Sequence, residues 1–534
     1  MSIFDTGMPH HDSLPSVAKM VGGSAATFSL REPLKGLLKL SVRLLILLIF
    51  LLIVGLNAST VTSGGIIQEE TYQRLEQIRD EKKAQLFNYL EKIRSSANDI
   101  KNDRVMLEFF HLKRQFYQLR KTTRPPEALV REITKLKERI KEHYIQKYLK
   151  FYDILFIDRN GDIFYTIRKQ SDYHKNIFQG KLAETALAME LEKFPHQSFV
   201  DYHYYFVSDE PSAFLIVPVM TEKTIAGWII FQCAINNINH IFAQEKELGA
   251  TGEVFLVNKQ ECMLTDSRFF GYSTSLKKHL SHENIAGKFK ERIGQKTVID
   301  YRGHRVLSSF EVCNMLNEEW LLIAKIDEAE IITDHYRKNR HTLNPILINY
   351  FKKEKAAYRD FTPIDCESTI VDMDEFRKVY NNEKISTFGI STCTAAIVSL
   401  PNGFAYMAHI SNLDRIYGGQ TTDLLSNIFK QIKTFDIYKY EIRDLRVILV
   451  ANHFETITNA IDLLVDEGVF LSQIKFIYNC RAKYANLLYD YKTNQTRVEW
   501  MMEGGSRNML RQRASDVHSL GCLIQPLIHY TNEK

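Results

Sequence analysis

The chain is poor in the features that mark metal proteins and nucleic-acid-binding proteins. Its seven cysteines are scattered over 534 residues without a Cys-x-x-Cys spacing, which argues against a zinc or iron–sulfur site. Because the count is odd, at least one thiol has no disulfide partner within the chain. A net charge of +5 over this length is too small to indicate nucleic acid, and we find no recognition motif for it.

The sequence contains a single long apolar run that could cross a membrane. Residues 44–56 read LLILLIFLLIVGL, and no charge follows before Glu69. With the uncharged residues behind it, the run can cross a bilayer, which takes ~20 residues. Lysines and arginines precede it and acidic residues follow, so we predict a cytoplasmic segment at 1–40, a transmembrane helix at 41–63 and an extracytoplasmic remainder. A cleaved signal peptide is the alternative, although 43 residues before the run are too many for one.

Proline and glycine are absent between Glu69 and Arg120, and apolar residues recur there at helical spacing. This pattern predicts one long amphipathic stalk helix, ended by TTRPPE at 122–127 and followed by a second helix. The two apolar stripes are Leu86, Leu90, Ile93, Ala97 and Ile100, then Leu129, Ile133, Leu136, Ile140 and Tyr144. A membrane-proximal coiled coil has the same pattern, so a homodimer through the stalk helix is compatible with it.

An internal repeat follows the stalk. The first copy opens with YDILFIDRNGDIFYTI (152–167), two apolar strands around an Asn-Gly hairpin turn, and closes with AGWIIFQCAINNIN (226–239). The second copy opens with GEVFLVNKQECMLTDSRF (252–269) and closes with EEWLLIAKIDEAEI (318–331). Each copy thus ends in an apolar strand led by tryptophan, and we predict two mixed α/β modules behind one stalk helix.

These motifs, together with DYHYYFVSDEPSAFLIVPV (201–219), resemble the extracytoplasmic double Cache (PAS-like) sensor domain over residues 66–335. The resemblance implies a small-molecule ligand in the membrane-distal module, in a pocket lined by Tyr202, Tyr204, Tyr205 and Asp209. The alternative is that these tyrosines alternate along a strand and pack against the helices. The arginine–tryptophan–aspartate set of amino-acid-binding members is missing, so the ligand stays unassigned.

A polar linker is predicted at 336–365, followed by a domain at 366–505 and a tail at 506–534. The domain alternates apolar strands with helical patterns. Its strands are TAAIVSL (394–400), GFAYMAHI (403–410), LRVILVAN (445–452) and IKFIYNC (474–480), its helices 421–435 and 456–469, and its last hairpin 489–501. This order predicts a layered α/β domain, and the chain as a whole is predicted to be a multidomain α+β and α/β protein.

A cysteine stands where a small-residue turn runs into an apolar strand, in STFGISTCTAAIV (386–398). LPNG at 400–403 is a hairpin turn, so the far ends of its strands meet, and these ends carry Cys393 and His409. An imidazole there can activate the thiol, with Thr387 orienting the ring. Gly389, Ser391 and Thr392 would leave backbone N–H groups for an oxyanion. The alternative is a buried structural thiol, because free cysteines are among the most buried residues.

The same segments resemble the chemoreceptor glutamine deamidase (CheD) family over about 366–502. Thr387, Cys393 and His409 match the family's catalytic threonine, cysteine and histidine, although Ser-Thr-Cys replaces the usual Gly-Ser-Cys. The resemblance implies hydrolysis of a glutamine side-chain amide on a protein substrate through a thioester on the cysteine. This chemistry needs neither a metal nor an organic cofactor.

The combined prediction is a sensor anchored by a single span in the bacterial inner membrane, with a Cys/His protein-glutamine deamidase domain. The alternative is a non-enzymatic ligand-sensing receptor whose CheD-like domain only binds a partner protein. One conflict stays open, because the family's substrates are cytoplasmic whereas the charge bias places this domain outside. Either the substrate is extracytoplasmic, or the anchor inserts the other way, or the protein works in another cell's membrane.

Overall fold

A computed structural model describes residues 63–193, 196–221, 224–243, 248–353, 367–380, 382–400, 403–411, 423–436, 442–502 and 507–513. The predicted N-terminal segment at 1–40 and transmembrane helix at 41–63 lie outside these residues apart from Ser63, and so does most of the tail at 506–534. Among the helices of the described residues, none is both long enough and apolar enough to span a membrane.

Three helices open the described chain: α2 (Ser63–Ile100), α3 (Arg104–Thr122) and α4 (Glu127–His143). Both predicted apolar stripes are buried. The prediction of one uninterrupted stalk helix is wrong, because the helix is interrupted between the end of α2 and the start of α3. Asp103 caps the new helix there, its carboxylate accepting a hydrogen bond from the backbone N–H of Met106 at 3.2 Å.

Two antiparallel sheets follow, with strand orders β2-β1-β5-β4-β3 and β6-β9-β8-β7. Their strands are β1 (Asp153–Asp158), β2 (Ile163–Thr166), β3 (Ser198–Tyr205), β4 (Glu210–Thr221), β5 (Thr224–Ala234), β6 (Glu253–Val257), β7 (Ile293–Ile299), β8 (Arg305–Met315) and β9 (Glu318–Asp327). Between them lie α5 (Ala186–Leu191), α6 (Asn236–Phe242) and α7 (His282–Glu291). We call residues 153–234 the first module and 253–327 the second.

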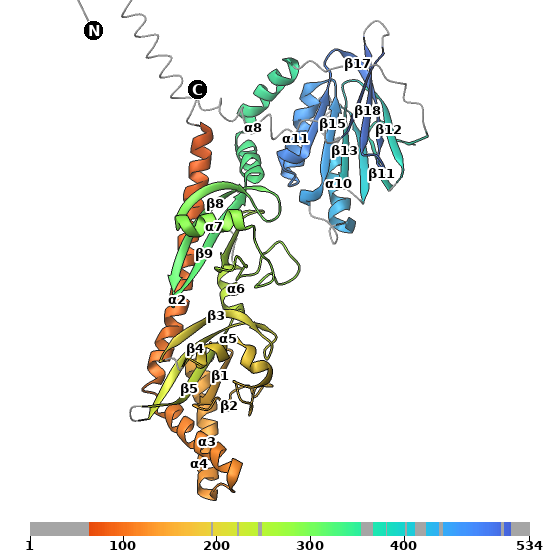
Figure 1. Cartoon of the computed structure of the whole chain (residues 1–534). Helices are drawn as coiled ribbons and strands as arrows, with labels where there is room; N and C mark the ends of the chain where they lie inside the picture. Colours follow the sequence, from red (N-terminus) through yellow and green to blue (C-terminus); the bar gives the residue numbers. More distant parts are fainter. Residues whose placement is uncertain are drawn as a thin grey trace, which may run out of the picture. The chain divides into compact units, whose positions relative to one another are not determined.

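The two modules repeat one arrangement, which explains the repeat in the sequence. The opening strand pairs with the tryptophan-led strand in both, β1 with β5 and β6 with β9. The indoles of Trp228 and Trp320 are fully buried. Helix α2 packs against strands of both sheets, as Figure 1 shows, so one helix backs both modules.

Helix α8 (Glu328–Lys353) leads directly from β9 into the C-terminal domain. The linker predicted from residue 336 is therefore largely helical up to Lys353, with a kink at Asn339 (φ −116°, ψ 16°). The proline at 345, inside the helix, weakens the helical signal of this segment in the sequence. Leu343 and Leu347, one helical turn apart after the kink, are fully buried in the core of the C-terminal domain, and Tyr336 before the kink is buried there too.

The C-terminal domain contains two mixed sheets with strand orders β11-β14-β13-β15-β16 and β10-β12-β17-β18-β19. The strands are β10 (Thr369–Ile370), β11 (Glu375–Tyr380), β12 (Lys384–Ile390), β13 (Thr394–Leu400), β14 (Phe404–Ile410), β15 (Arg446–Ala451), β16 (Ile474–Tyr478), β17 (Ala482–Asp490), β18 (Gln495–Met502) and β19 (Arg507–Arg513). The helices are α10 (Asp423–Gln431) and α11 (Phe454–Asp466).

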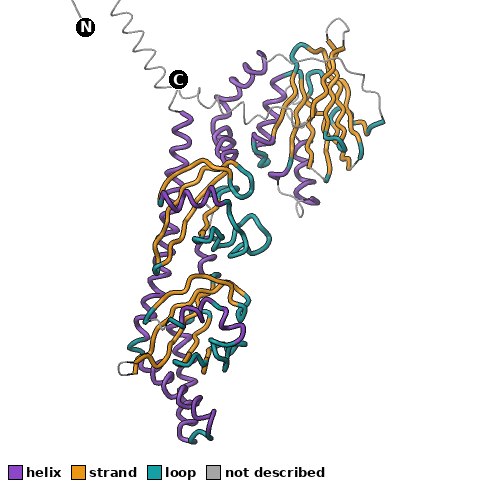
Figure 2. The backbone as a smooth tube through the Cα atoms, in the orientation of Figure 1, coloured by secondary structure: helices purple, strands orange, loops and turns teal. Residues whose placement is uncertain are grey.

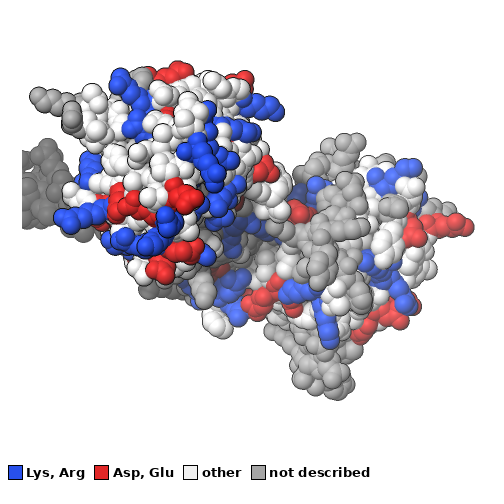
Figure 3. All heavy atoms as spheres, turned by 90° about the horizontal axis from the view of Figure 1, so that it is seen from below, with Lys and Arg blue, Asp and Glu red and all other residues white. Residues whose placement is uncertain are grey.

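These elements form three layers, visible in Figure 2 as purple helices beside two orange sheets. One face of the β11–β16 sheet packs on α8, α10 and α11, and the other face packs on the second sheet. The described residues thus have the predicted mixed α/β, multidomain character, with several largely antiparallel sheets. Figure 3 shows basic and acidic side chains mixed over the visible surface, in line with the small net charge.

Candidate functional site

The candidate catalytic residues lie between the two sheets of the C-terminal domain. Strands β13 and β14 pair antiparallel, with Ala395 opposite His409. Side chains alternate between the faces of a strand, so Cys393, Ala395 and His409 share one face. That face points to the second sheet, because Cys393 and Ala395 belong to the apolar cluster between the sheets.

Thr387 reaches the same place from the second sheet. Its Oγ1 lies 2.7 Å from Nδ1 of His409 and donates its proton to the carbonyl of Val371, also at 2.7 Å. A threonine hydroxyl has one proton, so Nδ1 of His409 must be the donor toward Thr387. The imidazole is thereby held as the Nδ1–H tautomer, with a lone pair on Nε2. The structure brings these two predicted residues together.

His409 is buried and neutral. Burial lowers the pKa of its imidazole, and the nearby Asp374 and Asp372 oppose this shift only in part. Its Nε2 is buried and has no hydrogen-bond partner within the described residues. An unpaired buried nitrogen is costly in a native protein, and such groups are found at functional sites. A neutral Nε2 is able to take a proton from a thiol.

Cys393 lies on the face of His409 but is not open to solvent, in contrast to what attack on an amide requires. It is 4% exposed and packs within the apolar cluster between the sheets. Since Nε2 of His409 is unpaired, the thiol is not hydrogen-bonded to it in this conformation. Cys393 and His409 are diagonal neighbours across the β13–β14 hairpin, because Ala395 is directly opposite His409. Diagonal residues of this kind lie about 7–8 Å apart.

The predicted oxyanion turn is only partly available. Gly389 adopts a left-handed φ of 74°, and its N–H donates to Oδ1 of Asn486 at 3.1 Å, so this donor is already used. The hydroxyl of Ser391 donates to the carbonyl of Lys483 at 3.1 Å. Ser391 and Thr392 are exposed immediately before Cys393. The expectation that the whole turn offers free N–H groups is therefore wrong at Gly389.

The four residues predicted to line one ligand pocket in the first module point in different directions. Tyr202 is buried in the cluster shared with α2, whereas Tyr205 is buried on the opposite face and donates to Asp172 at 3.0 Å. Tyr204 is 59% exposed and its hydroxyl donates to Asp209 at the surface. The register of β3 against β4 is irregular between Val200 and His203, around Tyr202. They do not form one pocket.

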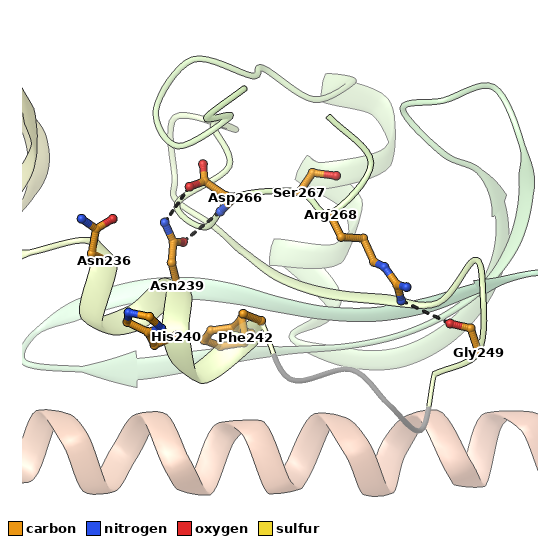
Figure 4. A pocket seen from close by; sticks show the side chains of 9 residues that line it. Asn236, Asn239, His240, Phe242, Gly249, Asp266, Ser267 and Arg268 are labelled. Atoms are coloured by element: carbon orange, nitrogen blue, oxygen red, sulfur yellow. Dashed lines mark hydrogen bonds between the residues drawn. The ribbon is translucent and has the colours of Figure 1, made fainter. Parts of the chain in front are cut away.

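A cleft of about 720 Å³ opens beside α6. In Figure 4 Asn239 points to Asp266, and the two exchange hydrogen bonds of 2.8 and 2.9 Å. Arg268 donates to the carbonyl of Gly249 at 3.2 Å. The Asn239–Asp266 bonds hold a loop of the second module to α6.

A second thiol–imidazole pair was not predicted. Sγ of Cys262 lies 3.2 Å from Nε2 and 3.3 Å from Nδ1 of His279. Burial raises the pKa of the Cys262 thiol, which keeps it protonated. No short motif signals this pair, because the two residues meet only through an isolated bridge between separate segments. Among the described residues, no cluster of three or more His, Cys, Asp or Glu side chains is placed to hold a metal ion.

About half of the chain has known structural neighbours. No protein-family model matches it, and no curated protein matches its sequence. The chain is similar to the ligand-binding domain of Pseudomonas fluorescens chemoreceptor CtaA in complex with L-leucine, at 11% identity and a TM-score of 0.31, over 50% of this chain and 97% of that one. It is also similar to the periplasmic sensory domain of the Campylobacter jejuni chemoreceptor Tlp1, at 11% identity and a TM-score of 0.35, over 50% of this chain and 98% of that one.

A third neighbour is an extracellular ligand binding receptor from Desulfohalobium retbaense, at 14% identity and a TM-score of 0.30 over 50% of this chain. The alignment spans 40% of the length of that receptor. Of these three neighbours, one is thus an extracellular receptor and another a periplasmic sensory domain.

Proposed function

We propose that the protein is a small-molecule sensor joined to a thiol-dependent amidohydrolase that acts on glutamine side chains of a protein substrate. The sensor part is supported by the two repeated modules along α2 and by the Cache-like motifs in their strands. The hydrolase part is supported by one observation above all. Among the described residues, the neutral Nε2 of His409 is buried without a hydrogen-bond partner on the face that carries Cys393.

The reaction follows from these groups. Nε2 of His409 takes the thiol proton, and Sγ of Cys393 attacks the carboxamide carbon of glutamine. The C–N bond breaks as His409 returns the proton to the leaving ammonia, which leaves a thioester. Water, deprotonated by His409, then cleaves the thioester and releases glutamate and the free thiol. Access to Sγ requires segment 388–392, which is exposed apart from Ile390, to move when substrate binds.

Helix α8 is the proposed link between the two functions. Near its start, the carboxylate of Glu330 accepts hydrogen bonds from the backbone N–H groups of Ala250 and Thr251, both at 2.7 Å, just before β6 of the second module. Its later turns carry Leu343 and Leu347 into the C-terminal core. A change in the second module on ligand binding would thus move a helix that is part of the hydrolase domain.

A non-enzymatic role is the second candidate, and two observations favour it. Cys393 is buried, and the N–H of Gly389 is already bonded to Asn486. In that case the C-terminal domain binds a partner protein without chemistry, and the sensor controls the binding.

Mass spectrometry separates the two candidates. The full-length protein in detergent is incubated with chemoreceptor proteins as glutamine donors, and the one-dalton gain at glutamine is read by peptide mapping. We expect turnover by the wild type and by Cys480→Ala, which removes an exposed thiol on another segment. Cys393→Ala and His409→Gln should be inactive. Equal activity of Cys393→Ala and wild type would exclude the hydrolase.

The side of the membrane is part of the proposal. The charge bias around residues 44–56 supports a single anchor with the N-terminus in the cytoplasm. A periplasm-active reporter and a cytoplasm-active reporter, each fused after Lys534, test this. Signal from the cytoplasmic reporter alone would reverse the orientation and place the C-terminal domain beside cytoplasmic substrates.

A further inference from the structure

The second module contains a small, partly open cavity between its sheet and α7. Its volume is about 60 Å³. The walls are mainly apolar, from the strands and from the start of α7, including Leu280, Ile285, Val298 and Ile323. Polar groups also line it: two lysines, the hydroxyl of Ser308, the turn at 300–301, and Ser281 and Asn284 near the start of α7. The two lysines are Lys288 and Lys325.

Lys288 is the unusual member of this lining. It is 4% exposed, and within the described residues it has no ion pair and no hydrogen bond; its ammonium lies 5.6 Å from the centre of the Phe310 ring. Burial lowers the pKa of this amine to about 8, and Lys296 and Lys325 add to the shift. Burying a charge without a partner is expensive, so this amine is poised to pair with an anion.

Ser308 is the second incomplete group. It is 1% exposed, and its Oγ is buried without a hydrogen-bond partner in the described chain. Buried hydroxyls are nearly always paired in native proteins. One unpaired donor on α7 and another on β8 thus line the same cavity.

The other lysine of the cavity is already satisfied. The ammonium of Lys325 pairs with Asp300 and lies 3.2 Å from Glu253, whose carboxylate also accepts from Tyr301 at 2.6 Å. Although burial works against it, the positive charges of Lys325 and Arg302 hold the pKa of Asp300 at about 2. These acids are therefore engaged elsewhere, and none of them pairs with Lys288.

We propose that this cavity binds a short-chain monocarboxylate, with its carboxylate on Lys288 and Ser308 and its hydrocarbon part against the apolar wall. At ~10–15 Å³ for each atom-sized probe, the volume corresponds to roughly four to six non-hydrogen atoms, the size of acetate to butyrate. The assignment rests on the proposed sensor role and names its ligand class.

On the corresponding face of the first module's sheet, the described residues form a packed apolar cluster. Apolar side chains from 177–191, including Leu182 and Leu187, fill the position against Trp228 and Ile230. The hydroxyl of Tyr205 is bonded to Asp172 there. The charged cavity of the second module is the better ligand site, in contrast to the membrane-distal site that the sequence resemblance implied.

Calorimetry on the full-length protein in detergent tests the proposal, with propionate as ligand and propionamide as its uncharged isostere. We expect propionate binding by the wild type, at least tenfold weaker binding by Lys288→Met, and little binding of propionamide. Lys290→Met is the matched control, because Lys290 is exposed on the same helix, and it should bind as the wild type does. Ser308→Ala should weaken binding severalfold.

The thermal midpoint of the unliganded variants tells a ligand site from a structural lysine. Removing an unpaired buried ammonium should leave the midpoint of Lys288→Met unchanged or raise it. A marked fall would mean that Lys288 is structural and would overturn the proposal, as would equal propionate affinity in Lys288→Met and wild type, or equal affinity for propionamide. Binding is measured without any glutamine substrate, so loss of the hydrolase function would not change the result.

Discussion

Thr387 and His409 lie in different sheets, yet their Oγ1 and Nδ1 atoms are 2.7 Å apart. The contact exists only when the β12 and β14 sheets are packed face to face. The packing of the domain therefore determines which tautomer His409 adopts, and with it the direction of the free lone pair.

Replacing Thr387 with valine should leave the buried Nδ1–H of His409 without an acceptor. An unsatisfied buried donor costs about 1–3 kcal/mol, measurable by urea denaturation. Ser386→Ala is the control, because Ser386 is the neighbouring buried residue and its hydroxyl is bonded to Ser368 at 2.7 Å, away from His409. In the hydrolase proposal, Thr387→Val loses turnover beyond its stability cost. Equal turnover in both variants would contradict a positioning role for Thr387.

Stability should depend on pH through His409. The folded pKa of this histidine lies below the unfolded value of 6.5, so the unfolded chain binds the proton more readily. The contribution of neutral His409 to the free energy of unfolding is complete above pH 6.5. It is lost as the pH falls through the folded pKa, by at most ~1.4 kcal/mol per pH unit. Denaturation of the wild type and His409→Gln between neutral and mildly acidic pH checks this. If the unfolding free energy of His409→Gln falls with pH as steeply as that of the wild type, the pH dependence comes from other groups.

Two contacts between α8 and α11 should differ in strength. The hydroxyl of Tyr336, on a fully buried side chain, lies 2.8 Å from the carboxylate of Asp462, so Tyr336→Phe should cost about 1.5–3 kcal/mol. Arg340 and Asp466 pair at 3.0 Å, but their side chains are 33% and 50% exposed. Arg340→Ala should therefore change the unfolding free energy by less than ~1 kcal/mol. Chemical denaturation measures both changes. A larger loss of unfolding free energy in Arg340→Ala than in Tyr336→Phe would contradict the packing of α8 described above.

Thiol alkylation followed by peptide mapping should distinguish Cys393 from Cys480. The first is 4% exposed and the second is exposed, so iodoacetamide should modify Cys480 faster by about an order of magnitude or more. A substrate protein that opens segment 388–392 should raise the rate at Cys393 alone. Equal rates without substrate would show that the thiol is accessible in solution, in conflict with its burial here.

Local periodicity was enough to predict much of the secondary structure. The stripe from Leu86 to Ile100 is buried, because residues at helical spacing share one face. The last hairpin turns at Asn494, which takes a φ of 50° and accepts a hydrogen bond from Tyr489 at 2.7 Å. Asparagine tolerates this left-handed conformation, so the signal was local.

The helix break at Asp103 and the helical identity of 336–353 were not predictable in the same way. A hydrogen bond from Met106 to the Asp103 side chain decides the first, within a segment whose composition continues to favour helix. The second depends on Tyr336, Leu343 and Leu347 finding a core in another part of the chain. Propensity is a weak prior, and tertiary packing overrides it.

The amino-acid sequence by itself determined the helical stripes, the repeated modules and the hairpin that carries Cys393 and His409. Only the tertiary structure decided that Thr387 meets His409, that Cys393 is buried, that the tyrosines of β3 face different ways, and that Lys288 and Ser308 border one cavity. The physical reason is the distance along the chain over which each feature is determined. A helical or strand pattern is set by a few neighbouring residues, whereas burial and the pairing of distant strands depend on how the whole domain packs.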